Sequence, residues 1–143
     1  MKDADLREIL KTPKVVAVVG VSRDPSKDSH RVAEYLKSKG FTVVPINPFV
    51  NEVLGERAYK SLLDAPEDVQ KTIEIVDVFR PSDEVEDVVK QAVQLKNRYG
   101  LLDVFWMQLG IVNEHAADLA RKAGIAVVMD ECIMQQHKRL FGA

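Results

Sequence analysis

One stretch near the N-terminus, residues 14–30 (KVVAVVGVSRDPSKDSH), constrains the fold of this chain more than any other. It opens with the apolar, mostly β-branched run Val15–Val19, which suits a strand buried on both faces of a parallel sheet. Gly20 then permits a sharp turn at the end of this strand. A polar loop follows, and the pattern predicts a helix over 30–39 with Ser29 as its N-cap. A strand, a turn and a helix start in this order form an anion site, because the first N–H groups of a helix lack intrahelical partners.

The rest of the chain alternates further apolar runs with helical patterns. The runs predict four more strands: Phe41–Ile46, which Pro45 and Pro48 are expected to stop, Thr72–Phe79, Leu101–Met107 and Ile125–Met129. Apolar residues at helical spacing predict further helices over 3–11, 82–98 and 113–123, the second of them capped by Ser82. A short helix is expected over 58–63, and the tail 130–143 is expected to be polar with a helical turn at its end.

Strands that alternate with helices predict parallel βαβ units. We therefore expect an α/β, Rossmann-like, doubly wound and mostly parallel five-stranded sheet, flanked by helices in three α/β/α layers. The sequence shows no internal repeat, low-complexity run or linker, so we expect residues 1–143 to form a single domain.

Composition narrows the class of partner. The net charge is −2, the pI is near 5.9 and aromatic residues make up 6% of the chain, which disfavours nucleic acid as a partner. No apolar run approaches the roughly 20 residues of a membrane helix. The charged N-terminus and the single cysteine lead us to expect a cytoplasmic protein without membrane contact.

In a doubly wound sheet, ligands bind outside the carboxyl ends of the strands, near the point where strand order reverses. The segments expected at that edge are 20–29, Asn47-Pro48, Phe79-Arg80-Pro81, Gln108-Leu109-Gly110 and Asp130-Glu131-Cys132.

The first loop also restricts which nucleotide fits. It has one glycine, so it is neither a G-x-G-x-x-G fingerprint nor a P-loop. The first acidic residue after the second strand is Glu52. This disfavours NAD, because no acidic side chain at the end of that strand is available to bind the ribose 2′-hydroxyl. Arg23 and Lys27 offer cations for an extra phosphate, as in NADP or on the 3′-phosphate of coenzyme A. Judged by charge alone, Arg23 and Lys27 are equally consistent with loop residues that only contact solvent.

A set of motifs in a fixed order carries a resemblance to a known family. These motifs are VVGVSRDPSKDSH, VVPINP, AYKSL, DVFRP, WMQLGIVNE and VVMDECI. Together they resemble the small stand-alone CoA-binding proteins, which are similar to the N-terminal CoA-binding domain of the succinyl-CoA synthetase α subunit. The resemblance covers about residues 10–138.

The resemblance implies a Rossmann-like domain that binds coenzyme A as its cofactor. It assigns the pyrophosphate to the first loop and helix start: Gly20, Val21, Ser22, Ser29 and His30. It assigns the phosphorylated ribose to Arg23 and Lys27, and the adenosine end to Asn47 and Pro48. It assigns the pantetheine or phosphates to Phe79, Arg80 and Pro81, and the outer reach of the pantetheine to Gln108, Leu109 and Gly110.

The resemblance implies binding of CoA or an acyl-CoA rather than ligase activity. The synthetases use a second domain with a phosphorylated histidine, and 143 residues leave no room for it. We therefore expect a protein that is not an enzyme. The alternatives are an NADP-binding oxidoreductase and a CoA-responsive regulatory or interaction subunit, and self-association as a homo-oligomer fits the latter.

Cys132 is the remaining candidate for chemistry. Its place after the fifth strand would let its thiol meet the CoA thiol or steer an acyl group, so we include it among the cofactor-binding residues. The competing interpretation is a small buried apolar residue. Cys132, His137 and Asp130 match no standard ligand spacing, so no metal site is expected.

Overall fold

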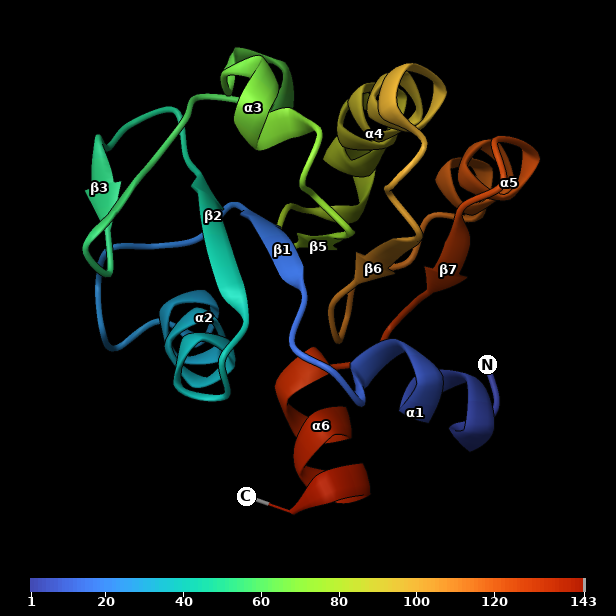
Figure 1. The fold of residues 1–143 in the computed structure, drawn as a ribbon, viewed down its shortest axis with the longest axis horizontal. Coiled ribbons are helices and arrows are strands. Elements are labelled where there is room, and N and C mark those ends of the chain that lie inside the picture. Colours follow the sequence, from blue (N-terminus) through green and yellow to red (C-terminus); the bar gives the residue numbers. More distant parts are fainter. Residues whose placement is uncertain (143) are drawn as a thin grey trace.

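Five parallel strands form the central sheet of the computed structural model, which describes residues 1–142. They lie in the order β2-β1-β5-β6-β7, so the chain steps outward from β1 to β2 and then returns to the other side of β1 (Figure 1). Their bounds are β1 Val15–Val19, β2 Thr42–Ile46, β5 Ile75–Val78, β6 Val104–Met107 and β7 Ala126–Val128. This reversal between β1 and β5 confirms the expected Rossmann-like, doubly wound sheet.

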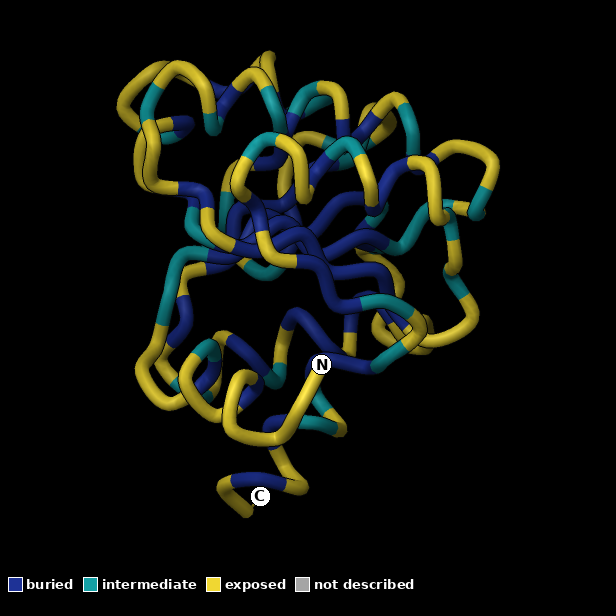
Figure 2. Tube along the Cα trace, turned by 90° about the vertical axis from the view of Figure 1, so that its right-hand side faces the viewer, coloured by how far each residue is buried: buried dark blue, intermediate teal, exposed yellow. Residues whose placement is uncertain are grey.

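Helices cover both faces of the sheet. Within residues 1–142 they are α1 Asp3–Leu10, α2 Asp28–Ser38, α3 Glu67–Gln70, α4 Val85–Tyr99, α5 Glu114–Lys122 and α6 Ile133–Phe141. Figure 1 shows α4 and α5 on one side of the sheet and α1, α2 and α6 on the other. In the turned view of Figure 2, a buried central layer lies between two helical layers with exposed outer turns. The expected three-layer architecture is confirmed. No described helix is long and apolar enough to span a membrane.

The hydrophobic runs of the strands explain why the sheet is central. In β1, Ala17 and Val19 pack into the core cluster under α4 and α5, whereas Val16 and Val18 pack into the cluster under α1, α2 and α6. A strand that faces two helical layers has no polar face, which is why its sequence shows an unbroken apolar run rather than alternation.

Pro45 lies inside β2, so the expectation that it stops this strand is wrong. Pro45 pairs in register with Val18 of β1, and its carbonyl oxygen accepts a hydrogen bond from Tyr59 N at 3.0 Å on the outer side. The N and O of one strand residue point to the same side, so the missing N–H of Pro45 also faces outward. An edge strand tolerates proline in this orientation because no hydrogen bond of the sheet is lost.

Ser29 is not the N-cap of α2. The helix begins at Asp28 and its N-cap is Lys27, whose side chain makes no capping hydrogen bond. Ser29 instead lies in the first turn, where its Oγ accepts from Ser22 N at 2.9 Å. Ser82 likewise does not cap α4, because it begins the 3-10 turn η2 (Ser82–Glu84) and its Oγ accepts from Val112 N at 3.1 Å.

Two regions contain more structure than the sequence patterns predicted. The tail forms α6, which contacts α1 through a bidentate bond from Arg139 to Asp3 at 2.9 Å and a bond from Arg7 to the Leu140 carbonyl at 3.2 Å. The connection after β2 contains a small antiparallel pair, β3 Glu52–Val53 and β4 Glu56–Arg57. The short helix predicted over 58–63 is reduced to the 3-10 turn η1 at Leu62–Asp64.

Candidate binding site at the carboxyl edge

Gly20 directly follows β1 at a point where a side chain would be strained. Its φ is +88°, a region that favours glycine, and a Cβ at this position would lie 2.9 Å from Arg80 Cδ and 3.1 Å from the carbonyl oxygen of Phe79. The backbone of the first loop therefore passes directly against the end of β5. This close approach brings together the two chain segments at which the strand order reverses.

The predicted site residues of the first loop hold its shape. Ser22 N donates to Ser29 Oγ at 2.9 Å, and Nδ1 of the buried His30 donates to the Ser22 carbonyl oxygen at 2.8 Å. Asn47 fixes the same loop from β2, since its Nδ2 donates to the Val21 carbonyl oxygen at 2.9 Å. These side chains hold the backbone of the loop in position, and most of its own N–H groups are engaged within the loop. Ser22 N, Asp24 N and Ser26 N donate to side-chain oxygens, and Lys27 N donates to the Asp24 carbonyl oxygen.

The first turn of α2 is a source of unpaired donors. The first backbone bond at the helix start runs from Arg31 N to the Lys27 carbonyl oxygen at 3.1 Å, so the N–H groups of residues 28–30 precede the intrahelical ladder. Because the side chain of Lys27 gives no cap, these donors and the positive end of the helix dipole favour an anion.

The charges around this turn favour the same anion. Within residues 1–142, Arg23 and Lys27 are exposed and form no ion pair, whereas Asp28 pairs with Arg31. Asp24 is also engaged, since it accepts from the backbone N and the hydroxyl of Ser26, and these bonds lower the pKa of its carboxyl group. Arg23 and Lys27 therefore have no direct ion-pair partner, although Asp24 stays negatively charged and interacts with Lys27 through space.

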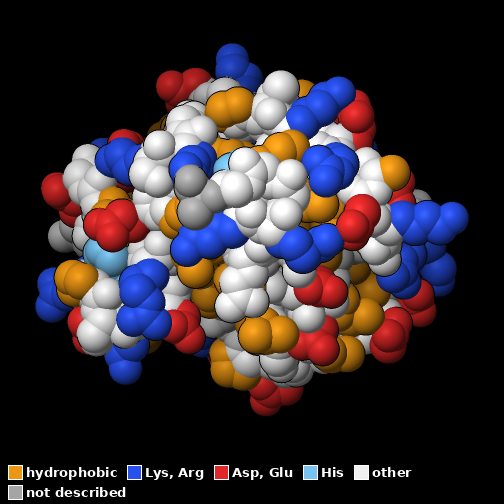
Figure 3. Space-filling model, turned by 90° about the horizontal axis from the view of Figure 1, so that it is seen from below, with side chains coloured by type: hydrophobic (Ala, Val, Ile, Leu, Met, Phe, Trp, Pro, Cys, Tyr) orange, Lys and Arg blue, Asp and Glu red, His pale blue; other side chains and the backbone are white. Residues whose placement is uncertain are grey.

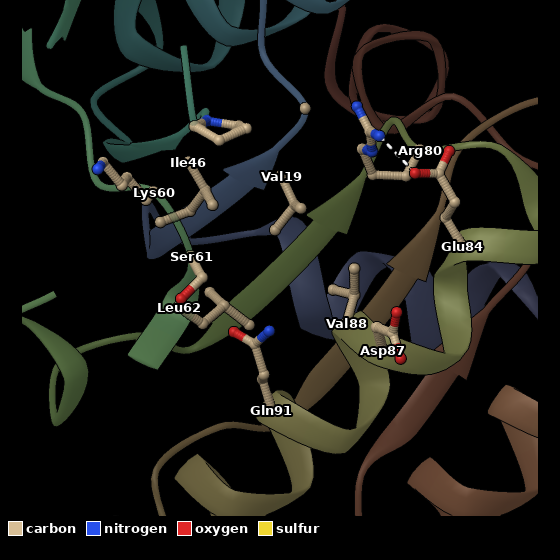
Figure 4. Close-up of a pocket in the computed structure, with 12 residues that line it drawn as sticks. Val19, Ile46, Lys60, Ser61, Leu62, Arg80, Glu84, Asp87, Val88 and Gln91 are labelled. Carbon is tan, nitrogen blue, oxygen red and sulfur yellow. Dashed lines mark hydrogen bonds and ion pairs between the residues drawn. The ribbon is translucent and has the colours of Figure 1, made fainter. Parts of the chain in front are cut away.

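A first cavity of about 180 Å³ opens on the α4 side of the sheet edge. Figure 4 shows its walls, in which Val19, Ile46 and Val88 provide an apolar surface and Asp87 provides acceptor atoms. An apolar slot with a few convergent polar groups suits a planar heterocycle such as a purine. The cavity is lined by Val19, Gly20, Ile46, Pro48, Lys60, Ser61, Leu62, Arg80, Glu84, Asp87, Val88 and Gln91.

A second cavity of about 350 Å³ opens at the same edge on the opposite face. It lies between the first turns of α2, the segments after β5 and β6, and the start of α6. It is lined by Asp28, Arg31, Val32, Phe79, Gln108, Leu109, Ile111, Cys132, Met134 and Gln135. Two residues that are adjacent in the chain line different cavities, because Phe79 lines the second and Arg80 lines the first.

The structure brings only part of the predicted site to these cavities. The first cavity includes Gly20, Pro48 and Arg80, and the second includes Phe79, Gln108, Leu109 and Cys132. The remaining predicted residues line neither cavity: Val21, Ser22, Arg23, Lys27, Ser29, His30, Asn47, Pro81 and Gly110. Of these, Gly110 donates its N–H to Asp130 Oδ1 at 2.6 Å, which ties the loop after β6 to the loop after β7.

Sequence reasoning missed the contribution of α4 to the first cavity. Glu84, the last residue of η2, and Asp87 and Gln91 of α4 occur at spacings of three and four, so they form one polar stripe along these two consecutive elements. A polar stripe next to a buried face can indicate a binding surface. The same pattern occurs on any solvated helix surface, so it does not identify a site by itself. Arg80 extends this surface, because its Nη2 lies 2.5 Å from Glu84 Oε1.

The surface carries no block of a single charge on the face that is visible in Figure 3. Lys and Arg side chains lie among Asp and Glu side chains there, with hydrophobic side chains between them. Among residues 1–142, no group of three His, Cys, Asp or Glu side chains is placed to hold a metal ion. His137 Nδ1 lies 2.7 Å from Tyr35 OH, so this histidine is engaged with α2.

The fold and the site together define a Rossmann-like α/β domain whose first loop and helix start lie at the switch point of its sheet. Residues 14–138 match the CoA binding domain family, and the chain belongs to that family. It is 36% identical over 134 residues to the uncharacterized protein YneT of Bacillus subtilis (strain 168), which covers 94% of this chain and 93% of that protein.

Two further comparisons place the chain among proteins of different size. A solved structure of a hypothetical protein from Pyrococcus horikoshii OT3 has a TM-score of 0.89 and 37% identity, with 99% of this chain and 94% of that chain covered. The acetate–CoA ligase [ADP-forming] II of Archaeoglobus fulgidus is 35% identical over 92 residues. That match covers 63% of this chain and 13% of the ligase.

Proposed function

We propose that this protein binds coenzyme A or an acyl-CoA across the carboxyl edge of its sheet, and that its role is binding rather than turnover. The observation that carries the proposal is the position of the loop Gly20–Ser29, which lies between two cavities on opposite faces of the same edge. Coenzyme A has a matching order of parts: a nucleotide, a pyrophosphate and a pantetheine that ends in a reactive thiol.

The residues present fit each of these parts. The first cavity would hold the adenine, whose exocyclic amine can donate to the acceptor atoms of Asp87. The N–H groups of residues 28–30 would hold the pyrophosphate. Arg23 and Lys27 would meet the 3′-phosphate, and Phe79 with Gln108 would border the pantetheine.

The family supports the same ligand. The chain belongs to a family described as a CoA binding domain, and a partial relative is called an acetate–CoA ligase. The part of that ligase that matches is small, so its ligase activity is not transferred to this chain. A binding role also fits His30, whose Nδ1 is occupied by the Ser22 carbonyl oxygen and shapes the loop.

Native mass spectrometry of freshly purified protein, followed by calorimetric titration with CoA, dephospho-CoA, NADP and NAD, tests the proposal. We expect CoA to bind most tightly and dephospho-CoA to bind more weakly. Selective binding of NADP would replace the proposal with a nicotinamide-dependent function, and binding of none of the four would overturn it. Release of free thiol from acetyl-CoA, measured over hours, should equal the protein-free blank if binding occurs without turnover.

A further inference from the structure

The second cavity has a lining that the CoA nucleotide does not explain. Its walls are mostly apolar, and a volume of about 350 Å³ lies within the range of small-molecule sites. The apolar side chains come from α2, from the segments after β5 and β6, and from the start of α6: Val32, Phe79, Leu109, Ile111, Cys132 and Met134. A phosphate gains nothing from such walls, whereas an aliphatic chain does.

Gln108 supplies one polar group whose orientation is fixed. Only 4% of this residue is exposed, and its Oε1 accepts from Ile133 N at 3.0 Å. A backbone N–H can only donate, so the oxygen of the amide must face α6 and its Nε2 must face the other way. Among residues 1–142 no acceptor is recorded for this Nε2, although Gln108 lines the cavity. This Nε2 is not among the buried atoms that lack a partner, so it is an accessible donor that can serve an acceptor atom of a ligand.

The charges of the lining narrow the ligand further. Arg31 is the only cation among the lining residues, all of which lie in the described part of the chain, and it is already paired with Asp28. It also donates to the Ser26 carbonyl oxygen at 2.8 Å. A ligand group that carries its own carboxylate would therefore find no free positive partner in this cavity.

We propose that this cavity holds the thioester end of an acyl-CoA that carries a short, uncharged aliphatic acyl group. The acyl chain lies against the apolar wall, and the thioester carbonyl oxygen accepts from Gln108 Nε2. This inference rests on the proposed binding of CoA and adds a substrate class to it: the preferred ligand is a short-chain acyl-CoA such as butyryl-CoA, rather than free CoA or a dicarboxylic acyl-CoA.

Calorimetric titration of the full chain with four ligands tests the inference. Each buried methylene is expected to tighten binding by up to about fourfold, so butyryl-CoA should bind roughly tenfold more tightly than CoA. Succinyl-CoA should bind no more tightly than CoA. S-butyl-CoA, a thioether without the carbonyl oxygen, should bind about fivefold more weakly than butyryl-CoA because it offers no acceptor to Gln108.

A matched pair of variants locates the effect. Leu109→Trp narrows the mouth of the cavity, and Leu101→Trp places the same ring before β6, at the opposite end of that strand; both leucines are exposed. We expect Leu109→Trp to reduce the preference for butyryl-CoA over CoA to less than twofold, and Leu101→Trp to preserve it. Three results would each overturn the inference while CoA binding stands. They are equal binding of CoA and butyryl-CoA by the unaltered protein, binding of succinyl-CoA that is tighter than that of CoA, and a preference for butyryl-CoA that is unchanged in Leu109→Trp. Failure of every CoA ligand to bind would instead overturn the proposed function.

Discussion

Asp77 is the residue whose chemistry differs most from its surroundings. It lies in the middle of β5 between Val18 and Trp106, with 0% of its surface exposed. Neither carboxyl oxygen has a hydrogen-bond partner within the described residues. Burial raises the pKa of this carboxyl group well above its ordinary value, because the apolar core disfavours the charged form. The folded protein therefore keeps Asp77 neutral at pH values at which an exposed carboxyl group is already charged.

This buried carboxyl group makes stability depend on pH in a defined direction. The pKa of Asp77 is higher in the folded than in the unfolded chain, so above pH 4 the unfolded chain releases a proton that the folded chain keeps. The free energy of unfolding should then fall as pH rises, by up to about 1.4 kcal/mol per pH unit from this group, until the folded pKa is passed. Asp77→Asn should remove this slope and raise stability at pH 8.

Urea unfolding between pH 5 and pH 8 measures the effect of Asp77→Asn. Asp83→Asn, at an exposed position of η2, serves as the control and should leave the slope unchanged. A slope that is equal in Asp77→Asn and in the unaltered protein would contradict the prediction.

A second prediction at this scale concerns Gly20. Gly20→Ala adds a Cβ that would meet Arg80 Cδ at 2.9 Å and also places alanine at a φ of +88°. We expect a loss of at least about 1–2 kcal/mol in stability and of tenfold or more in CoA affinity, because the loop must move away from β5. Thermal unfolding and titration with CoA measure the two losses.

Gly100→Ala separates the clash from the backbone strain at Gly20. Gly100 has a φ of +79°, but a Cβ there would meet nothing within 4 Å. The Gly100→Ala variant should lose about 1 kcal/mol of stability and keep its affinity for CoA. A CoA affinity that falls equally in Gly20→Ala and Gly100→Ala would show that the close approach to β5 is unimportant for binding.

At the scale of elements, the β1–α2 connection combines helix-start donors with two free cations. The double variant Arg23→Ala/Lys27→Ala should weaken the binding of CoA by about tenfold and that of dephospho-CoA much less, because only CoA carries the 3′-phosphate. The comparison is made by calorimetry at low and high salt, since exposed cations act less strongly when they are screened.

The control for this double variant removes two cations elsewhere. Lys71→Ala/Lys90→Ala changes the net charge equally at exposed positions outside both cavities and should leave both affinities unchanged. Equal losses for CoA and dephospho-CoA in the Arg23/Lys27 variant would remove the assignment of these residues to the 3′-phosphate.

The helices and strands differ in how well the sequence predicts them. All five strands and the β1–Gly20–α2 unit follow from apolar runs and a single glycine, because burial on both faces leaves a strong pattern. The tail helix α6 was missed, although Ile133, His137 and Leu140 form its buried stripe at spacings of four and three. Its short length and the polar residues between these positions conceal that stripe.

The site was less predictable than the fold. The family resemblance assigned Ser22, Ser29, His30 and Asn47 to ligand contacts, and in the structure hydrogen bonds of these residues hold the first loop in shape. Cavity walls depend on which side chains from distant elements converge, and pattern alone does not report this. The stripe on α4 and the apolar residues Val32 and Met134 could be assigned to cavities only in three dimensions.

At the scale of the whole molecule, each of the two cavities borders a different one of the two hydrophobic core clusters. The first is lined by residues of the α4–α5 side, such as Val88, and the second by residues of the α2–α6 side, such as Val32. A ligand that occupies both would bridge the two helical layers across the edge of the sheet. Binding should therefore stabilise both layers at the carboxyl edge together.

Hydrogen exchange with and without CoA tests this bridging. We expect slower exchange of backbone amides in residues 84–91 and in residues 108–112, which lie on opposite faces. The body of α5, residues 114–122, contacts neither cavity and serves as an internal reference whose exchange should change least. Protection confined to one face would contradict a ligand that reaches both.

The outward-facing nitrogen of Pro45 also affects how copies of this chain can meet. Along the outer side of β2, Pro45 has no N–H to donate, and its carbonyl oxygen already accepts from Tyr59 N at 3.0 Å. The opposite border of the sheet is β7, which is only three residues long. A neighbouring strand therefore finds few free backbone groups at either border, and edge-to-edge growth of the sheet between copies is disfavoured. Contacts between copies are therefore favoured at the helices and loops over the borders of the sheet.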